Sequence, residues 1–503
     1  MRTRIARITH IAVAAALSVT LAACGSQLSP DEVVAVSGGS SPGDGSVVTD
    51  PGNPGTDPGT TTDVPGVDDG ADSPQSDPGD PAGPGAAPGA PDPGQGAGDG
   101  APGPGGDDGK QGSGDNAPGG GDRAASCEGF KNQVGITDKT ILLANASDIS
   151  GPVPGLFTSA QDAVRAYIAY FNSQSDICNR KLELLALDSR TDNGADQQAY
   201  AKACQQAFAA VGSQSAFDSG GAAAAKGCGI PDIRATSVTS ERFSCPNCFS
   251  AQSVNVNQFQ NAVADFVKKT EPSAAKKAAY VWVNAGAGPL NAQNQAKAMT
   301  KRGMKFVYQQ GIDVSEFNYA PFVQQMKSKG VEFVQFLGAY QQAVRLAQTM
   351  QQQGFKPKMY LLDPTVYNQA FIEQGGAAVE GVRAFINTAM YDEIDSNKEM
   401  ALYRTWLNQV KPGAEPNFFG VWAWSATRLF VEQSLALGGK LTRESLVASM
   451  KGVKNWTAND LHSPQQVGAK QVGDCWRFIE LKGGKWVPTG SRKYTCNGIT
   501  NVN

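Results

Sequence analysis

The chain has 503 residues and a formal net charge of −4 at pH 7, with 58 glycines, 29 prolines and only two histidines. Only His462 lies beyond the first 23 residues, which argues against a histidine-rich metal site and against a Ser-His-Asp triad. Lys and Arg form no run interleaved with aromatic residues, so the sequence does not indicate a nucleic-acid partner. We therefore predict a protein that is not an enzyme and that needs no metal or cofactor.

The first 23 residues read as a secretory signal. Arg2, Arg4 and Arg7 precede an apolar stretch of small residues, residues 11–23, which is too short to span a bilayer comfortably. Cys24 directly follows Leu-Ala-Ala, a pattern that resembles the bacterial lipobox. That resemblance implies cleavage before Cys24, a diacylglycerol on its sulfur and a location on the outer face of the cell membrane. The alternative is an ordinary secretory signal followed by a chance cysteine.

Residues 24–126 are predicted to be a disordered tether. Large apolar side chains are nearly absent among its Gly, Pro, Asp, Ala and Thr residues, so no core could offset the entropy of ordering. Residues 25–126 carry 17 acidic residues against Lys110 and Arg123, whereas residues 127–503 carry a net charge of +8. Self-repulsion should keep the tether extended and hold the folded part clear of the membrane.

Strand and helix patterns alternate through residues 127–503. In the first half, strands are expected at 140–145, 182–188, 215–218 and 230–235. Helices are expected at 158–172, from the second strand through Phe208, and between the last two strands. After a helix at 258–269, strands are expected at 278–283, 306–309, 333–337 and 359–362, and helices at 290–301, 319–329, 343–353, 366–374 and 418–437.

Such an alternation predicts an α/β fold of two Rossmann-like lobes, each with a parallel sheet covered on both faces. The two runs of this alternation, one before and one after the helix at 258–269, suggest two similar lobes. Ligands of such sheets bind beyond the carboxyl ends of the strands, so the residues that follow each strand are the candidate site.

Eight cysteines remain after Cys24, an even number that suits disulfides in an exported protein. Proximity suggests the pairs Cys245–Cys248, Cys204–Cys228 and Cys475–Cys496, which leaves Cys127 with Cys178, although the sequence does not fix the connectivity. A redox pair or half a zinc site is the alternative for Cys245-x-x-Cys248, but no second cysteine pair lies at zinc spacing.

Several segments in order resemble the type I periplasmic binding proteins, specifically the branched-chain amino acid (Leu/Ile/Val) group of ABC importers. They are Ser150-Gly-Pro before an Ala-rich helix, Asp188-Ser-Arg-Thr-Asp192, the hydroxyl-rich stretch 233–240, Phe317-Asn-Tyr-Ala-Pro-Phe322 and Gly338-Ala-Tyr340. The resemblance covers roughly residues 134–503. It implies that lobe 1 holds about 134–255 and 388–455, and that lobe 2 holds about 256–387 and the C-terminal segment. It implies a small-molecule ligand held between two hinged lobes, an ABC permease as the membrane partner and, by default, a monomer.

The resemblance also implies ligand contacts. The hydroxyls of Ser219, Thr236, Ser237 and Thr239 would hold a ligand carboxylate, Tyr340 would add an aromatic contact and Asp363 could meet an ammonium group, with Phe157 and Trp422 at the cleft. The alternatives are that the hydroxyls satisfy loop backbone and that the aromatic residues belong to the core.

The loop at 284–289 departs from the family, because it lacks the tyrosine that amino acid binders usually have there. An α-amino acid is therefore one candidate among carboxylates, amides and aromatic acids. A surface sensor for a signalling partner, or a cell-wall lipoprotein with a vestigial cleft, are alternative functions. Both His462 and the pair Asp392-Glu393 read as parts of solvated loops.

Overall fold

The computed structural model describes residues 125–502. The predicted signal peptide, the lipidation at Cys24 and the tether up to residue 124 lie outside the described residues and stay predictions. Among the helices of the described part, none combines the length and the apolar character needed to cross a membrane.

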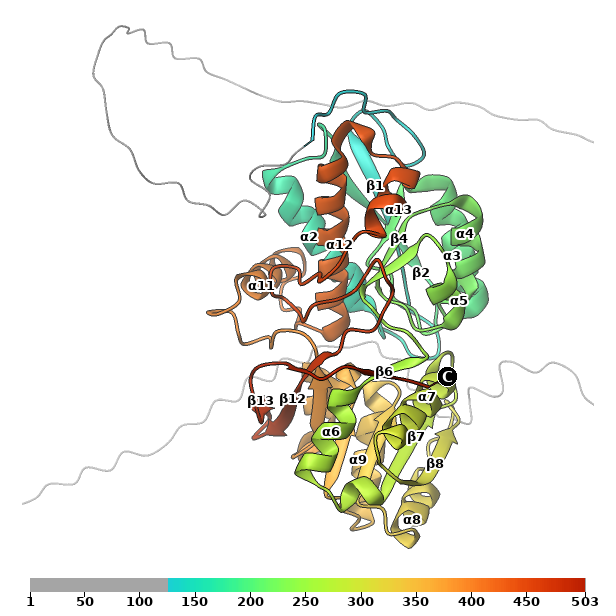
Figure 1. Cartoon of the computed structure of the whole chain (residues 1–503), viewed down its shortest axis with the longest axis vertical. Coiled ribbons are helices and arrows are strands. Elements are labelled where there is room, and N and C mark those ends of the chain that lie inside the picture. The colour runs from blue at the N-terminus through green and yellow to red at the C-terminus, as the bar shows by residue number, and fades with distance from the viewer. Residues whose placement is uncertain (1–124, 503) are drawn as a thin grey trace, which may run out of the picture. The chain divides into compact units, whose positions relative to one another are not determined.

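Lobe 1 is built on a five-stranded sheet with the order β2-β1-β3-β4-β5, in which every neighbouring pair is parallel (Figure 1). The strands are β1 (Thr140–Ser147), β2 (Lys181–Asp188), β3 (Ala209–Val211), β4 (Asp232–Thr236) and β5 (Cys248–Gln252). Strands β3 and β4 are buried throughout and β1 is buried at all but two positions, as expected where helices cover both faces.

Two groups of helices cover this sheet. On one face lie α2 (Thr158–Gln174), α11 (Lys398–Val410), α12 (Phe418–Leu437) and α13 (Arg443–Met450), and on the other α3 (Asn193–Gln206), α4 (Gly220–Cys228) and α5 (Ser240–Ser244). Helix α12 is apolar almost all round and buries Trp422 and Trp424 fully, which makes it the central helix of the lobe 1 core.

Lobe 2 repeats the same plan and then extends it. Its sheet has the order β13-β12-β11-β10-β9-β7-β8, parallel from β11 to β8 and antiparallel where β12 and β13 join. The strands are β7 (Ala278–Val283), β8 (Phe306–Ile312), β9 (Phe333–Leu337), β10 (Met359–Leu362), β11 (Arg383–Ile386), β12 (Cys475–Lys482) and β13 (Lys485–Thr489), with β14 (Thr495–Cys496) paired to β12.

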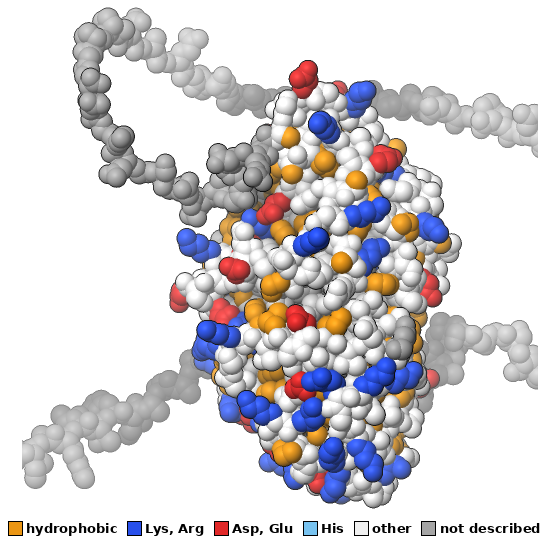
Figure 2. Space-filling model, in the orientation of Figure 1, with side chains coloured by type: hydrophobic (Ala, Val, Ile, Leu, Met, Phe, Trp, Pro, Cys, Tyr) orange, Lys and Arg blue, Asp and Glu red, His pale blue; other side chains and the backbone are white. Residues whose placement is uncertain are grey.

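One face of the second sheet carries α6 (Asn261–Thr270) and α7 (Gly288–Lys301), and the other α8 (Ala320–Ser328), α9 (Tyr340–Gln352) and α10 (Gln369–Gly375). A small antiparallel pair of β6 (Gln258–Gln260) and β15 (Ile499–Asn501) lies beside α7, and short 3-10 turns complete the lobe at 274–276, 364–366 and 376–379. Lys and Arg side chains gather over this lobe on the face in view (Figure 2). The two-lobed α/β fold predicted from the alternation is confirmed.

Three segments connect the lobes, and hydrogen bonds join them to one another. The backbone N–H of Ser253, after β5, donates to Oε1 of Gln465 at 3.1 Å. The N–H of Ser463 donates to the carbonyl of Asn387, after β11, at 2.8 Å. Because all three crossings lie together, a rotation of one lobe against the other would concentrate its backbone changes in this region.

The structure contains the four disulfides that proximity suggested, Cys127–Cys178, Cys204–Cys228, Cys245–Cys248 and Cys475–Cys496. The first three lie in lobe 1, and the fourth ties β12 to β14. The prediction of a structural disulfide at Cys245-x-x-Cys248 is therefore confirmed.

Two sequence-based expectations were wrong. Residues 215–218 form a turn rather than a strand, because their backbone N–H groups bind side chains: Ala216 donates to Asp148 at 2.8 Å and Phe217 to Ser215 at 3.1 Å. His462 is only 1% exposed instead of lying at the surface. Its ring packs 4.1 Å from that of Trp422, and burial lowers its pKa to about 3.

Candidate ligand cavity between the lobes

A cavity of about 340 Å³ lies between the lobes, which is within the usual size range of small-molecule pockets. In both sheets the second strand lies on one side of the first and the third strand lies on the other side. The strand order therefore reverses between β1 and β3 in lobe 1 and between β7 and β9 in lobe 2. The segments that follow these four strands supply cavity wall, including Phe157, Ala216, Ala285 and Gly338. The cavity therefore lies where doubly wound sheets bind their ligands.

The wall of the cavity is mostly apolar. Lobe 1 contributes Leu156, Phe157, Phe418 and Phe419, and lobe 2 and the connecting segments contribute Val283, Val314, Leu337, Phe385 and Trp476. The rings of Phe157 and Phe419 meet edge to face at 4.7 Å, which fixes the orientation of both. No Lys, Arg or His is among the described residues that line the cavity, and Asp363 is their one ionisable side chain.

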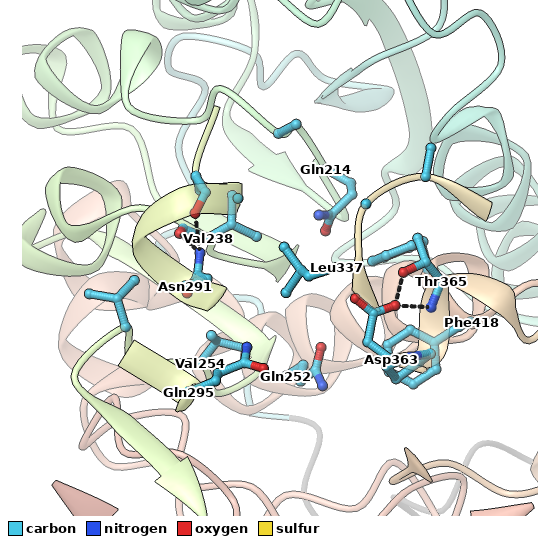
Figure 3. A pocket seen from close by; sticks show the side chains of 18 of the residues that line it. Gln214, Val238, Gln252, Val254, Asn291, Gln295, Leu337, Asp363, Thr365 and Phe418 are labelled. Carbon is cyan, nitrogen blue, oxygen red and sulfur yellow. Dashed lines mark hydrogen bonds between the residues drawn. The ribbon is translucent and has the colours of Figure 1, made fainter. Parts of the chain in front are cut away.

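Asp363 follows β10 and caps the 3-10 turn 364–366. One of its carboxylate oxygens, Oδ1, accepts a hydrogen bond from the N–H of Thr365 at 2.9 Å and another from the Thr365 hydroxyl. Oδ2 has no partner among the described residues, and Figure 3 shows the carboxylate extending toward the side of the cavity that Leu337 lines. Part of the side chain borders the cavity and is accessible there, but it lies deep in the protein, and this burial raises the pKa of Asp363 to about 7.

Side-chain amides supply most of the remaining polar atoms of the wall (Figure 3). Gln214 accepts from the N–H of Thr236 at 3.1 Å, and Gln295 accepts from the hydroxyl of Tyr280 at 2.6 Å. The amide of Gln252, the last residue of β5, has no hydrogen-bond partner within residues 125–502. Gln252 was not singled out from the sequence, although the rule that ligands meet the ends of strands points to it.

Only Phe157 and Asp363 of the eight predicted contact residues line the cavity. The four predicted hydroxyl residues lie outside it. Ser219 donates to Asn193 at 3.0 Å, Ser237 pairs with Ser250 at 2.6 Å, and Thr239 donates to Asp218. Thr236 is buried in β4. The hydroxyls of Ser219, Ser237 and Thr239 therefore bond to side chains of lobe 1, whereas the alternative weighed for them was that they satisfy loop backbone.

The two remaining aromatic candidates also lie outside the wall. Trp422 is fully buried in the core, where it stacks on His462. Tyr340 begins α9 and packs on the lobe 2 core, and its hydroxyl accepts a hydrogen bond from Gln374 at 3.3 Å. A direct ligand contact by either residue would require a different arrangement of these elements.

A buried charge network supports the lobe 1 side of the cavity. Arg242 donates to Asp232 at 2.9 Å, to Asp196 at 3.0 Å and to the carbonyl of Asp218 at 2.8 Å, and the three carboxylates and the guanidinium are fully buried. Burial raises the pKa of Asp218, and that of Asp196 to about 6, although the nearby arginines oppose the shift. Asp218 in turn accepts from the N–H of Val238 at 2.9 Å, which fixes a cavity-lining loop.

The two lobes touch at one edge of the cavity. The N–H of Ala287, in the loop after β7, donates to the carbonyl of Ala216 at 3.2 Å. Asn291 on α7 donates to the carbonyl of Val238 at 2.9 Å (Figure 3). Gly286 has φ +50°, and a Cβ atom there would lie 2.3 Å from the Ala216 oxygen. The close approach of the lobes therefore requires glycine at position 286.

The sequence model of a periplasmic binding protein family matches residues 140–485, more than half of the chain and nearly all of both lobes. The chain belongs to the periplasmic binding protein family. A curated relative, Leu/Ile/Val-binding protein homolog 1 of Brucella abortus (strain 2308), is 25% identical over 153 residues, or 30% of this chain. The match spans 39% of the length of that relative.

Solved structures share the fold over most of the described residues. A fatty acid ABC transporter substrate-binding protein from Thermomonospora curvata superposes with a TM-score of 0.64 at 17% identity, covering 74% of this chain and 97% of its own. A solute binding protein from R. palustris in complex with 4-hydroxybenzoate gives 0.59 at 17% identity, covering 71% and 97%. A leucine binding protein from Thermotoga maritima gives 0.59 at 15%, covering 72% and 99%.

Proposed function

We propose that this protein is the extracytoplasmic solute-binding subunit of an ABC importer, and that it captures a small solute in the cavity between its lobes by closing them. The observation that carries the proposal is the cavity itself, because it lies at the switch points of both sheets and has wall residues from both lobes. Membership of the periplasmic binding protein family supports the same role.

The named relatives support the importer context. The curated relative is a Leu/Ile/Val-binding protein homolog, and the solved neighbours include ABC transporter proteins for a fatty acid and for 4-hydroxybenzoate. These ligands share an apolar body, and the cavity of this chain is likewise mostly apolar. We therefore propose a solute with a substantial apolar part, rather than a fully polar one.

Closure is part of the proposal. Three connecting segments lie together and would act as the hinge, and the contact of Gly286 and Ala287 with Ala216 would seal one edge of the closed cleft. Closing removes the solute from water, so each remaining polar group contributes more to discrimination. A lipid on Cys24 and the acidic tether would hold this receptor near its permease, as a monomer.

The test is thermal unfolding of the purified full-length protein with a library of small solutes. A solute at 100 times its Kd should stabilise the folded state by about 2.7 kcal/mol. Leu337→Trp, which fills the cavity, should abolish the shift, whereas Leu290→Trp, at a side chain 44% exposed and away from the wall, should keep it. An unchanged response of both variants would contradict binding in this cavity. A cavity that takes no solute would favour a vestigial cleft.

A further inference from the structure

We infer that the cleft disfavours carboxylate anions and binds an apolar solute that is uncharged or cationic. An O–H or N–H group of this solute donates a hydrogen bond to Asp363. This inference rests on the proposed function and narrows the chemistry of its solute. It departs from the expectation of a carboxylate-bearing ligand that the resemblance to amino acid binders gave. Three independent features of the wall support it: the donors of lobe 1, the charges and the position of Asp363.

Four backbone donors at the strand ends of lobe 1 are already occupied by the protein. A carboxylate bound beyond the strands would need free N–H groups in the loops after β3 and β4. In these loops the N–H of Ala216 binds Asp148, that of Phe217 binds Ser215, that of Thr236 binds Gln214 and that of Val238 binds Asp218. These four donors are therefore satisfied by acceptors of the protein itself.

Three hydroxyl donors of the same region are occupied too. Thr239 donates to Asp218, Ser237 pairs with Ser250, and Ser219 donates to Asn193. Asp148 and Asp218 thus occupy the donors that an anionic ligand would need, and both are buried. Freeing these donors for a ligand would leave a buried carboxylate of the protein short of partners, which is costly.

The charges of the wall disfavour an anion as well. Among the described lining residues there is no cation, and Asp363 is the one ionisable group. A carboxylate enclosed here would lose its hydration without a positive partner and would also meet the Asp363 carboxyl. The side-chain donors left to it are neutral, namely amides such as that of Gln252 and the hydroxyls of Thr191 and Ser253.

The Asp363 carboxylate favours a solute group that donates a hydrogen bond or carries a positive charge. Its Oδ1 is held by Thr365, and its Oδ2 has no partner within residues 125–502 (Figure 3). A hydroxyl or ammonium donor of a solute would supply the missing hydrogen bond, and a cation would also compensate the charge. Gln252, from the other lobe, offers one further amide, and aromatic and aliphatic side chains such as Phe157 and Leu337 would enclose the rest of the solute.

The experiment compares matched solutes that share a skeleton and differ only in the head group. Alkyl, cyclohexylalkyl and phenylalkyl skeletons are each tested as the primary alcohol, the primary amine and the carboxylate, by calorimetric titration of the purified full-length protein. We expect binding by alcohols or amines and carboxylate affinities at least ~10-fold weaker on the same skeleton. The alcohol and amine series separate a neutral from a cationic solute.

Asp363→Asn tests the residue, because it keeps the shape and removes the charge. Amine affinity should fall by roughly 30-fold, and the penalty on the carboxylate of the same skeleton should shrink. Asp395→Asn, at an exposed position outside the cavity, is the matched control and should bind as the wild type does.

The outcomes separate the inference from the function on which it rests. Carboxylates that bind as tightly as their alcohols and amines would overturn the inference and leave solute capture standing. Binding by none of the three series would contradict solute capture itself, and the inference with it. Amine binding that Asp363→Asn leaves unchanged would also overturn the inference, because the donor would then bind elsewhere.

Discussion

Gly286→Ala tests whether the lobes must approach as closely as the structure shows. Gly286 lies in the loop after β7 with φ +50°, in the left-handed region that residues with a Cβ atom rarely adopt. The added Cβ would lie 2.3 Å from the carbonyl oxygen of Ala216, which belongs to the other lobe. The substitution therefore costs free energy in two places: in the left-handed backbone of the loop itself, and at the contact between the lobes, where the Cβ atom clashes.

The two costs affect different measurements. The left-handed conformation costs about 1–2 kcal/mol with or without a solute, so it lowers stability and not affinity. The clash arises only where the lobes meet, and relieving it sacrifices the Ala287-to-Ala216 hydrogen bond and strains the Asn291-to-Val238 bond. At about 1 kcal/mol for each bond, closure should lose about 2 kcal/mol, which weakens solute binding about 30-fold.

The assay is calorimetric titration with the tightest solute found, together with thermal unfolding without solute. Gly330→Ala is the matched control, because Gly330 has φ +61° and a Cβ atom added there would meet no atom within 4 Å. Both variants should lose similar stability, and only Gly286→Ala should lose affinity. Wild-type affinity in Gly286→Ala would refute the closed contact as a requirement for binding.

Three further predictions concern buried charge. His462 has a folded-state pKa of about 3 against an ordinary 6.5, so the unfolded state binds the proton first and the wild type loses stability as pH falls from 6.5 toward 3. His462→Gln should remove this loss and flatten the acid side of the plot of stability against pH, measured by thermal unfolding. Parallel plots for the variant and the wild type would contradict this prediction. Primary amines should bind more tightly as pH rises from 5 to 8, because Asp363, with a pKa of about 7, becomes negatively charged while its titratable neighbours Tyr280 and Tyr360 stay neutral. An amine affinity that calorimetry finds unchanged over this pH range would exclude Asp363 as the partner. Arg242→Met should lower the free energy of unfolding in urea by about 3–5 kcal/mol, because it leaves the buried carboxylates of Asp196 and Asp232 without their arginine. The control Arg165→Met, at an ion pair whose arginine is 45% exposed, should lower it by at most about 1 kcal/mol, and equal losses would contradict a stabilising role of the network.

The sequence predicted the fold well because hydrophobic periodicity is a local property. The helix expected at residues 418–437 has the same bounds in the structure, and the strand expected at residues 333–337 does as well. Hydrophobic periodicity failed to predict the structure of residues 215–218. Their composition suits a strand, but Asp148, far away in the chain, binds their backbone and holds them in a turn.

The site was less predictable, because its chemistry depends on partners that are distant in sequence. Asp363 and Phe157 follow strands or begin helices, and both line the cavity as their positions suggested. The hydroxyl of Thr239 has the same kind of position, yet it is bound by Asp218, which no local pattern reveals. His462 lies in a polar stretch of sequence but is buried by Trp422, a residue of another helix.

The most direct test of solute capture is a crystal structure of the protein with the tightest solute from the matched series. Solute capture predicts density for the solute between the lobes, with its donor on the free oxygen of Asp363 and its body against Phe157 and Leu337. Ala287 would remain bonded to Ala216 in that complex. Density for the solute outside the cavity, or a cavity left empty by a solute that binds in solution, would contradict solute capture between the lobes.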